Sequence, residues 1–424
     1  MEFKKYKIEE IGTVVGGGTP STKNDNYYGG NISWITPKDL SNYSNRYIYH
    51  GERNITEEGL NNSSAKLVPT DTILMTSRAP IGYLALAGKK VATNQGFKSI
   101  ICNEEIVSPK YLYYLLQNKM DNIKSLGTGS TFSEISGKVV KNIEVSLPNL
   151  LNQKRVEKVL DSIDEKIELN QKIIANLEEL SQTLFKRWFV DFEFPDENGN
   201  PYKSSGGEIV DSELGKIPKE WTVKPLNEFI DIIDNRGKTP PLVNEMRAHP
   251  IIDVKALSGD TRVIDYKKCL KFVSKETYDT WFRSGHPKKG DTLLSTVGSI
   301  GETKMFYHDI GTIAQNVVSL RSENSYFTYD LINNVKSSFL TFNIGSVQPS
   351  IKITHINKIK VVYPSKIVIE NYEKMIKKFI SNLYVRDLEN QNLIQLRDTL
   401  LPKLMSGEIE IPDDIEVNED ELSI

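Results

Sequence analysis

Asp291, Glu302 and Lys304 are the side chains of this sequence whose types and spacing best suit catalysis. Two carboxylates can hold Mg²⁺ and a nearby lysine can polarise a phosphate, which is the chemistry of a metal-dependent nuclease. An earlier, similar segment keeps the aspartate as Asp71 but has Tyr83 where Glu302 stands. A strand edge with ordinary surface charges explains the pattern better, so a stand-alone nuclease is kept only as an alternative function.

The sequence lacks other devices for catalysis. It contains neither a Gly-x-x-x-x-Gly-Lys-Ser/Thr phosphate loop nor an Asn/Asp-Pro-Pro-aromatic motif, and its five histidines are never spaced as a metal pair. Two cysteines, Cys102 and Cys269, are too few for a disulfide framework or a zinc site. We therefore expect no catalytic residue, no metal and no cofactor in this chain.

Length and composition indicate several compact units. A chain of 424 residues exceeds one ordinary core, and 38% hydrophobic with 26% charged residues is typical of a folded protein. No apolar run approaches the roughly 18 residues of a membrane helix, and the opening MEFKKYKIEE lacks the apolar stretch of a signal peptide. These features predict a cytoplasmic protein without membrane contact.

Charge alternates along the chain although the net charge is only -3. Residues 1–148 hold 17 basic and 14 acidic side chains, and residues 215–364 hold 21 and 15. Residues 149–214 hold 8 basic against 14 acidic side chains, and residues 365–424 hold 7 against 13. Two basic domains can offer positive surfaces to phosphate even in an acidic chain, although local fluctuation in composition is an alternative explanation.

An internal repeat explains this alternation. At a nearly constant offset of half the chain, DTIL (71–74) recurs as DTLL (291–294), and TNQGFKSI (93–100) faces IAQNVVSL (313–320). The repeat predicts an α/β (α+β) tandem fold in which each globular domain is followed by a long helix. The expected segments are domains at 1–148 and 215–364, helices at 149–192 and 365–406, a linker at 193–214 and a disordered acidic tail at 407–424.

The two helical segments carry apolar residues at three- and four-residue steps in one shared frame. About 40 residues at 1.5 Å each give roughly 60 Å, longer than a small domain is wide, so we expect the helices to pack on each other as an antiparallel, pseudo-twofold coiled coil. Polar residues interrupt both stripes near the middle. The residues predicted for the helix pair or for subunit docking are Ile163, Ile167, Asn170, Leu177, Leu180, Leu184, Trp188, Phe379, Leu383, Arg386, Asn390, Leu393, Leu396, Leu400 and Leu404.

Several ordered motifs resemble the specificity subunit of type I restriction-modification enzymes over nearly the whole chain. DSELGKIPKEWTVKPL (211–226) looks like the start of that family's second target-recognition domain, and GGGTPST with GGNISWITPKDL looks like the opening of the first. LEELSQTLFKRWFVDFEFP and LRDTLLPKLMSGEIEIP resemble the ends of its two spacer helices.

The resemblance implies a non-catalytic subunit that reads a bipartite double-stranded DNA target. Each recognition domain would read one half-site, and the helices would fix the gap between them. Two modification subunits, which bind S-adenosylmethionine and methylate adenine, would dock around the helices, and restriction subunits using ATP and Mg²⁺ would join them. A coiled-coil scaffold for protein interactions is the other alternative.

Candidate DNA contacts come from loops and strand ends that recur in both halves. Arg and Lys suit guanine, Asn and Gln suit adenine, and Ser, Thr and Lys hold phosphates. In the first half the candidates are Thr19, Ser21, Lys23, Lys38, Arg78, Asn94, Gln95, Lys98, Ser130 and Thr131. In the second half they are Lys238, Thr239, Lys255, Arg262, Thr296, Gln315, Asn316, Ser346 and Gln348.

Overall fold

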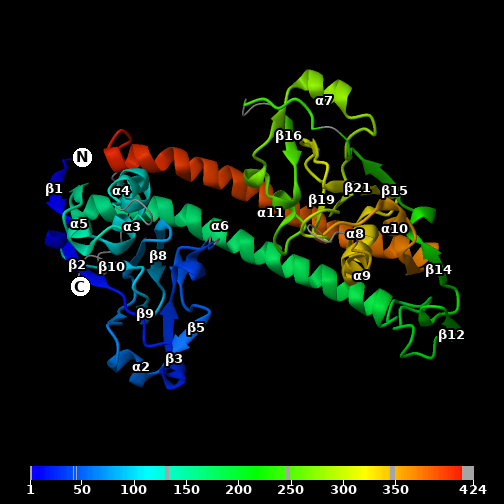
Figure 1. The fold of residues 1–424 in the computed structure, drawn as a ribbon, viewed down its shortest axis with the longest axis horizontal. Helices are drawn as coiled ribbons and strands as arrows, with labels where there is room; N and C mark the ends of the chain where they lie inside the picture. The colour runs from blue at the N-terminus through cyan, green and yellow to red at the C-terminus, as the bar shows by residue number, and fades with distance from the viewer. Residues whose placement is uncertain are drawn as a thin grey trace. The chain divides into compact units, whose positions relative to one another are not determined.

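The computed structural model describes residues 2–41, 43, 45–128, 133–237, 239–244, 249–343 and 349–412. Most of the predicted acidic tail at 407–424 therefore lies outside the described residues. The chain divides into two compact units (Figure 1). The first unit is Met1–Glu168 with Gln391–Ile424, and the second is Leu169–Asn390. Each unit combines one predicted globular domain with part of both long helices.

The described residues of the first unit form three β-sheets. A five-stranded sheet has the order β2 (Gly12–Gly16), β10 (Lys98–Cys102), β7 (Ile73–Ser77), β8 (Ile81–Ala87) and β4 (Tyr47–Ile48). A four-stranded sheet has the order β5 (Arg53–Ile55), β3 (Tyr28–Ile35), β9 (Val91–Thr93) and β6 (Leu67–Val68). The third sheet pairs β1 (Lys4–Lys7) with β11 (Glu144–Leu147). The run of apolar residues in β7 is buried along its whole length, as a central strand requires.

Short helices complete this unit. They are α1 (Ile8–Ile11), α2 (Glu57–Asn61), α3 (Pro109–Asn118), α4 (Met120–Ser125) and α5 (Gly137–Lys141), with single 3-10 turns at Asp25–Tyr27 and Pro37–Leu40. Helix α3 follows Ser108 and has proline in its first turn, where the missing N–H costs nothing. Its buried tyrosines and leucines join the core that also receives Val156 and Leu160 from the long helix α6 (Leu150–Phe185).

The second unit repeats the central strand order. Its four-stranded sheet runs β15 (Asp231–Asp234), β21 (Val317–Arg321), β18 (Thr292–Ser295) and β19 (Thr303–Met305), which matches β2-β10-β7-β8. Its other sheets are β17 (Phe272–Val273), β16 (His249–Ile252) and β20 (Thr312–Ile313); β14 (Thr222–Pro225) with β22 (Lys360–Tyr363); and β12 (Ile209–Ser212) with β13 (Gly215–Pro218). Its short helices are α7 (Lys275–Trp281), α8 (Ser325–Asn334), α9 (Lys336–Thr341) and α10 (Ile353–Asn357), with 3-10 turns at Leu226–Glu228, Val254–Leu257 and Tyr266–Lys268. This equivalence confirms the tandem repeat.

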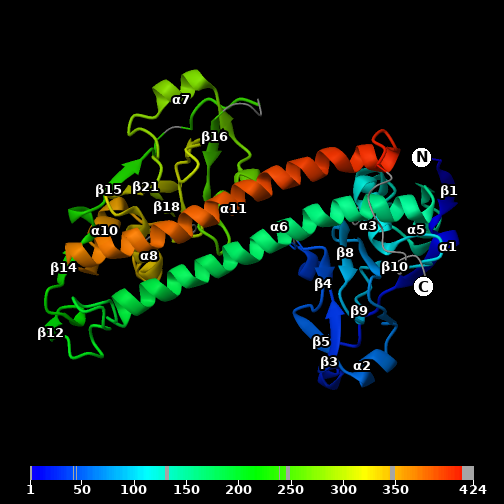
Figure 2. The same ribbon diagram turned by 180° about the vertical axis from the view of Figure 1, so that it is seen from behind.

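Two long helices, α6 (Leu150–Phe185, continued by a π-turn over Lys186–Val190) and α11 (Lys366–Ser406), pack on each other with opposite chain directions (Figures 1 and 2). In the first unit, Arg397 Nη1 lies 2.9 Å from Asp164 Oδ1. In the second unit, Asn170 pairs with Asn390 while the Trp188 and Tyr372 rings lie 5.8 Å apart. The predicted antiparallel pairing is therefore confirmed within each unit.

Most residues predicted for the apolar stripe face the helix pair or a domain core. The structure buries Ile163, Ile167, Asn170, Trp188, Leu383, Asn390 and Leu404, and half-buries Leu177, Leu184, Phe379, Arg386, Leu393 and Leu400. Leu180 and Leu396, predicted for the helix pair or for subunit docking, are 52% and 47% exposed and so do not lie in the helix seam, and their role in docking stays a prediction. Polar side chains, Ser181 and Arg397, turn inward beside them and make hydrogen bonds there.

The polar residues in the middle of the stripes meet in the second unit. Asn170 Nδ2 donates to Asn390 Oδ1 at 3.0 Å and to Glu389 Oε2 at 2.9 Å, and Arg386 donates to the same Glu389 oxygen at 3.0 Å. A polar cluster in an apolar seam penalises slipped registers because its members would then face leucine. No helix in the described ranges is both long and apolar enough to cross a membrane.

Candidate nucleic-acid interface

Two loops that carry predicted DNA contacts meet in the first unit. The Gly17 N–H donates to the Phe97 carbonyl at 3.3 Å, and the Gly18 N–H donates to the Thr93 carbonyl at 2.8 Å. A Cβ atom at Gly17 would lie 1.9 Å from the Asn94 carbonyl oxygen, so this close approach requires glycine. The segment that carries Thr19, Ser21 and Lys23 therefore starts beside the segment that carries Asn94, Gln95 and Lys98.

The equivalent loops meet in the second unit. Gln315 Nε2 donates to the Gly237 carbonyl at 2.9 Å and to Thr239 Oγ1 at 3.4 Å. Thr239, Gln315 and Asn316 line one cavity of about 530 Å³. The two loop pairs extend from equivalent strand pairings, β2 with β10 and β15 with β21. The contacts between the loops differ, because backbone N–H groups join the first pair and the Gln315 side chain joins the second.

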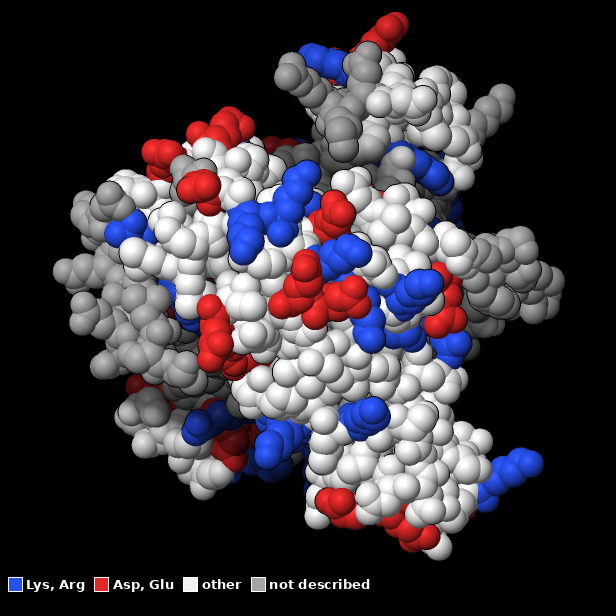
Figure 3. All heavy atoms as spheres, turned by 90° about the vertical axis from the view of Figure 1, so that its left-hand side faces the viewer, with Lys and Arg blue, Asp and Glu red and all other residues white. Residues whose placement is uncertain are grey.

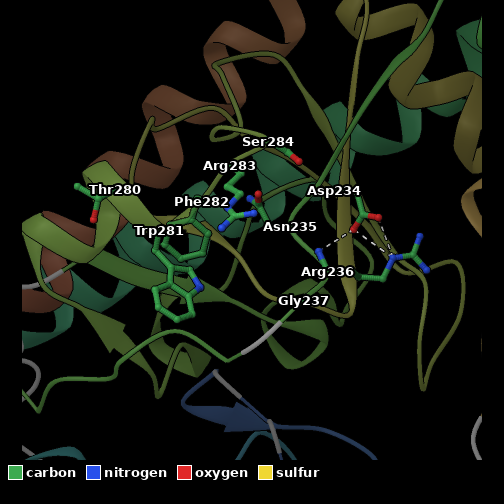
Figure 4. Close-up of a pocket in the computed structure, with 9 residues that line it drawn as sticks. All are labelled: Asp234, Asn235, Arg236, Gly237, Thr280, Trp281, Phe282, Arg283 and Ser284. Atoms are coloured by element: carbon green, nitrogen blue, oxygen red, sulfur yellow. Dashed lines mark hydrogen bonds and ion pairs between the residues drawn. The ribbon is translucent and has the colours of Figure 1, made fainter.

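A second cavity of about 500 Å³ adjoins the first and was missed by the sequence analysis. Figure 4 shows that its lining comes from two segments, 234–237 and 280–284. Arg236 is held by Asp234, with Nε 3.1 and 2.9 Å from the two carboxylate oxygens, and Trp281 is 39% exposed. Arginine can read guanine and an exposed indole can stack on a base. Arg283 also lines this cavity, and the detectable signal was the run TWFRS (280–284), in which an aromatic pair precedes Arg283.

Five predicted basic contacts lie at the surface or partly exposed, and three have acidic partners. Lys38 Nζ lies 2.6 Å from Glu52, whereas Arg78 and Lys98 share Glu134 at 3.5 and 3.7 Å. Exposed pairs such as Lys38 with Glu52 contribute about 0–1 kcal/mol, so a phosphate can replace the carboxylate at little cost. The other two, Lys23 and Lys255, are exposed, and Lys255 lies on the 3-10 turn Val254–Leu257.

The structure contradicts two of the predicted contacts. Arg262 is fully buried and bonded to Glu178 and Asp330, and Thr296 is also fully buried, with its backbone N–H donating to the Asn316 carbonyl at 2.8 Å. Neither side chain can reach DNA in this structure. Five further predicted contacts, Ser130, Thr131, Lys238, Ser346 and Gln348, lie outside the described residues.

Surface charge is mixed on the face that Figure 3 presents, where Lys and Arg are interspersed with Asp and Glu. On this face, phosphate contacts would therefore be made by individual basic side chains rather than by one broad positive area. Such contacts weaken as salt concentration rises, because bound cations are released from DNA when a protein neutralises its phosphates.

The alternative nuclease site does not assemble. Asp291 is buried against Arg321, whose Nη2 lies 2.7 Å from its carboxylate, and Glu302 pairs with Lys336. Lys304 is buried and donates to the Gly259 carbonyl at 2.7 Å, and burial lowers the pKa of its ammonium to about 8. In the part of the chain that the structure describes, no group of three or more His, Cys, Asp or Glu side chains could hold a metal ion.

Comparison with known proteins places these features in context. Residues 1–179 and 218–397 match the family described as type I restriction modification DNA specificity domain. The chain is 34% identical over 422 residues to the type I restriction enzyme MjaIX specificity subunit of Methanocaldococcus jannaschii, covering 96% of this chain and 93% of that protein. It is 25% identical over 370 residues to the HindI specificity subunit of Haemophilus influenzae, covering 74% and 80%.

A solved structure has the same fold. The type I restriction-modification S subunit from M. genitalium superimposes with a TM-score of 0.59 at 16% identity, over 95% of this chain and 96% of that one. The likeness covers both globular domains and both long helices, so the tandem arrangement is shared.

Proposed function

Because the chain belongs to the family of type I restriction-modification DNA specificity subunits, we propose that each of its two recognition domains reads one half of a bipartite DNA target. The observation that carries this proposal is a loop pair at equivalent places in both units: Gly17 and Gly18 bond the segment Thr93–Phe97 that contains Asn94, and Gly237 and Thr239 bond Gln315. Both pairs present Asn or Gln side chains, which can bond adenine edges. Their side chains differ, so the two half-motifs should differ as well.

The chain itself supplies recognition, and its partners supply the chemistry. We assign S-adenosylmethionine to two modification subunits, and ATP and Mg²⁺ to restriction subunits, all in the cytoplasm. The exposed apolar side chains on the helices, among them Leu180 and Leu396 at 52% and 47% exposure, support docking of those subunits. Because about half of each of these leucines is already buried, a partner that covers the rest gains about 0.7–1.5 kcal/mol per leucine.

Methylome sequencing of cells with and without this gene tests the proposal. We expect a split adenine motif that disappears with the gene. Replacement of residues 1–148 by the equivalent domain of a relative should change one half-motif and leave the other half-motif and the gap unchanged. A change in both half-motifs would show that the two domains do not read separately. If no motif disappeared when the gene was deleted, the recognition role would be refuted.

A further inference from the structure

A buried arginine ties the first recognition domain to α6. Arg46 is 6% exposed, and its Nε lies 3.1 Å from Glu168 Oε1 while Nη1 bonds Asp161 and lies 3.3 Å from the Tyr114 hydroxyl. Its backbone N–H also donates to Glu168 at 3.3 Å, and its carbonyl accepts from the Leu86 N–H at 2.7 Å. The residue thus joins strand β8, helix α3 and helix α6 at one point.

A second buried arginine does the same in the other unit. Arg262 is fully buried; its backbone N–H donates to Glu178 Oε1 at 2.5 Å and its Nε to Glu178 Oε2 at 3.0 Å. Its Nη2 lies 2.7 Å from Ser181 Oγ and 3.3 Å from Asp330 Oδ1. Its carbonyl accepts from the Met305 N–H on β19 at 2.8 Å and from the Tyr384 hydroxyl on α11 at 3.3 Å.

The two arginines are equivalent in the repeat. The spacing from Arg46 to Arg262 equals the spacing from Tyr114 to Asp330, and both agree with the offset between the repeated motifs. In both units one glutamate accepts from the arginine's backbone N–H and from its Nε, and a strand N–H donates to the arginine's carbonyl. The same set of hydrogen bonds around a buried arginine therefore recurs in both halves, although some of the residues that bond the arginine differ.

One partner has changed in an informative way. Strict repetition, at the spacing that relates the two arginines, would place the second glutamate on α11, but the position equivalent to Glu168 is Tyr384. The acceptor is instead Glu178, which follows Glu168 further along α6. Both arginines thus bind glutamates of α6. Helix α11 contributes Tyr384, which bonds the carbonyl of Arg262, and Arg397, which bonds Asp164 beside Arg46.

We propose that Arg46 and Arg262 are positioning residues, each of which fixes one recognition domain at one place on α6, and that the helical stretch from Glu168 to Glu178 sets the gap between half-sites. This inference rests on the proposed reading of a bipartite target. The gap would then depend on a short segment of α6 between two attachment points rather than on the whole helix.

Electrostatics explains why a buried arginine suits this role better than a leucine. An apolar contact can slide by a turn of helix, about 5.4 Å, and exchange one set of methyl groups for another. A buried guanidinium that slides leaves its own charge and that of its glutamate without partners, and breaking a buried pair costs about 3–5 kcal/mol. Because a buried ion pair adds little net stability compared with well-packed apolar residues, the restriction to one register is its distinctive effect.

The experiment compares the full chain, assembled with its modification subunits, as wild type and as Arg46→Met and Arg262→Met. Each complex methylates duplexes that carry both half-motifs with the natural gap or with a gap one base pair longer or shorter. We expect both half-motifs to be retained while methylation of the altered gaps, relative to the natural gap, rises about tenfold, a loss of about 1.4 kcal/mol of discrimination. Arg187→Met, at an exposed arginine after α6, is the matched control and should leave the discrimination unchanged.

Two milder variants keep the test decisive if either arginine variant fails to fold. Glu168→Gln and Glu178→Gln retain shape and one acceptor oxygen, and they should relax the gap in the same direction. Folded variants that discriminate against altered gaps as well as the wild type does would overturn the inference, as would a change in either half-motif. A wild-type complex that methylates no bipartite duplex would instead refute the proposed function, which separates the two failures.

Discussion

Lengthening both long helices together should widen the gap by about two base pairs. Insertion of four helix-forming residues after Lys172 in α6 and after Leu388 in α11 falls inside the stretch between the arginine attachment points. Four residues add about 6 Å at 1.5 Å each, and B-DNA rises about 3.4 Å per base pair. Four residues also turn an α-helix by about 400°, so the apolar stripe beyond the insertion is rotated by only about 40° from its original direction.

The assay is methylome sequencing of cells that express the lengthened chain with its modification subunits. Both half-motifs should persist and the gap should be longer. The matched control inserts four residues at the exposed turn of Asp196–Asn200, where Asp196 accepts from Asn198 and Asn200, and should not alter the gap. Insertion in α6 alone should abolish methylation because it separates Asn170 from Asn390. An unchanged gap with full methylation in the doubly lengthened chain would refute the reasoning.

Three further predictions follow from single side chains. Arg283→Ala, in the cavity beside Trp281, should relax discrimination between bases at one position of the second half-motif by about 1–3 kcal/mol, measured by letting unmethylated duplexes compete for methylation. Uniform weakening across all sequences would show a phosphate contact instead. Trp188→Asp should cost about 3–5 kcal/mol in urea unfolding because it removes a ring packed on Tyr372 and buries a charge, whereas Leu180→Asp, at an exposed position, should leave stability nearly unchanged and reduce subunit docking. Burial raises the pKa of Glu373 to about 7, so the folded state holds an extra proton and the free energy of unfolding falls as pH rises from about 4.5 to about 7. Glu373→Gln should flatten this dependence on pH and stabilise the protein at pH 8 by at most ~3 kcal/mol. An equal dependence on pH in the two proteins would contradict the assignment.

The periodic and repeated parts of the chain were predictable because they depend on local patterns. Apolar spacing located both long helices, and the repeat located equivalent strands such as DTIL in β7 and DTLL in β18. The polar cluster of Asn170 and Asn390 also followed, because antiparallel pairing of two stripes in one frame brings their interruptions together.

The contacts that decide the role of a single polar residue were not predictable. Arg262 looked like a surface residue because its partner Glu178 lies 84 positions away in the sequence. Asp291 looked catalytic for the same reason, since Arg321 neutralises it from another strand. Leu180 and Leu396 fitted the apolar spacing but are exposed. Their neighbours Ser181 and Arg397 point inward instead because they have hydrogen-bond partners there, which the spacing of apolar residues does not reveal.

The division of the chain into units has a consequence for synthesis on the ribosome. The second unit is one continuous stretch, Leu169–Asn390, whereas the first needs both Met1–Glu168 and Gln391–Ile424. Leu401, Leu404 and Met405 enter the same core as Ile8 and Ile11, and a side chain at Gly407 would meet the Phe3 ring. Domains generally fold as units during synthesis. The unit whose sequence emerges first therefore finishes last, and until the end of α11 is made its core lacks Leu401, Leu404 and Met405.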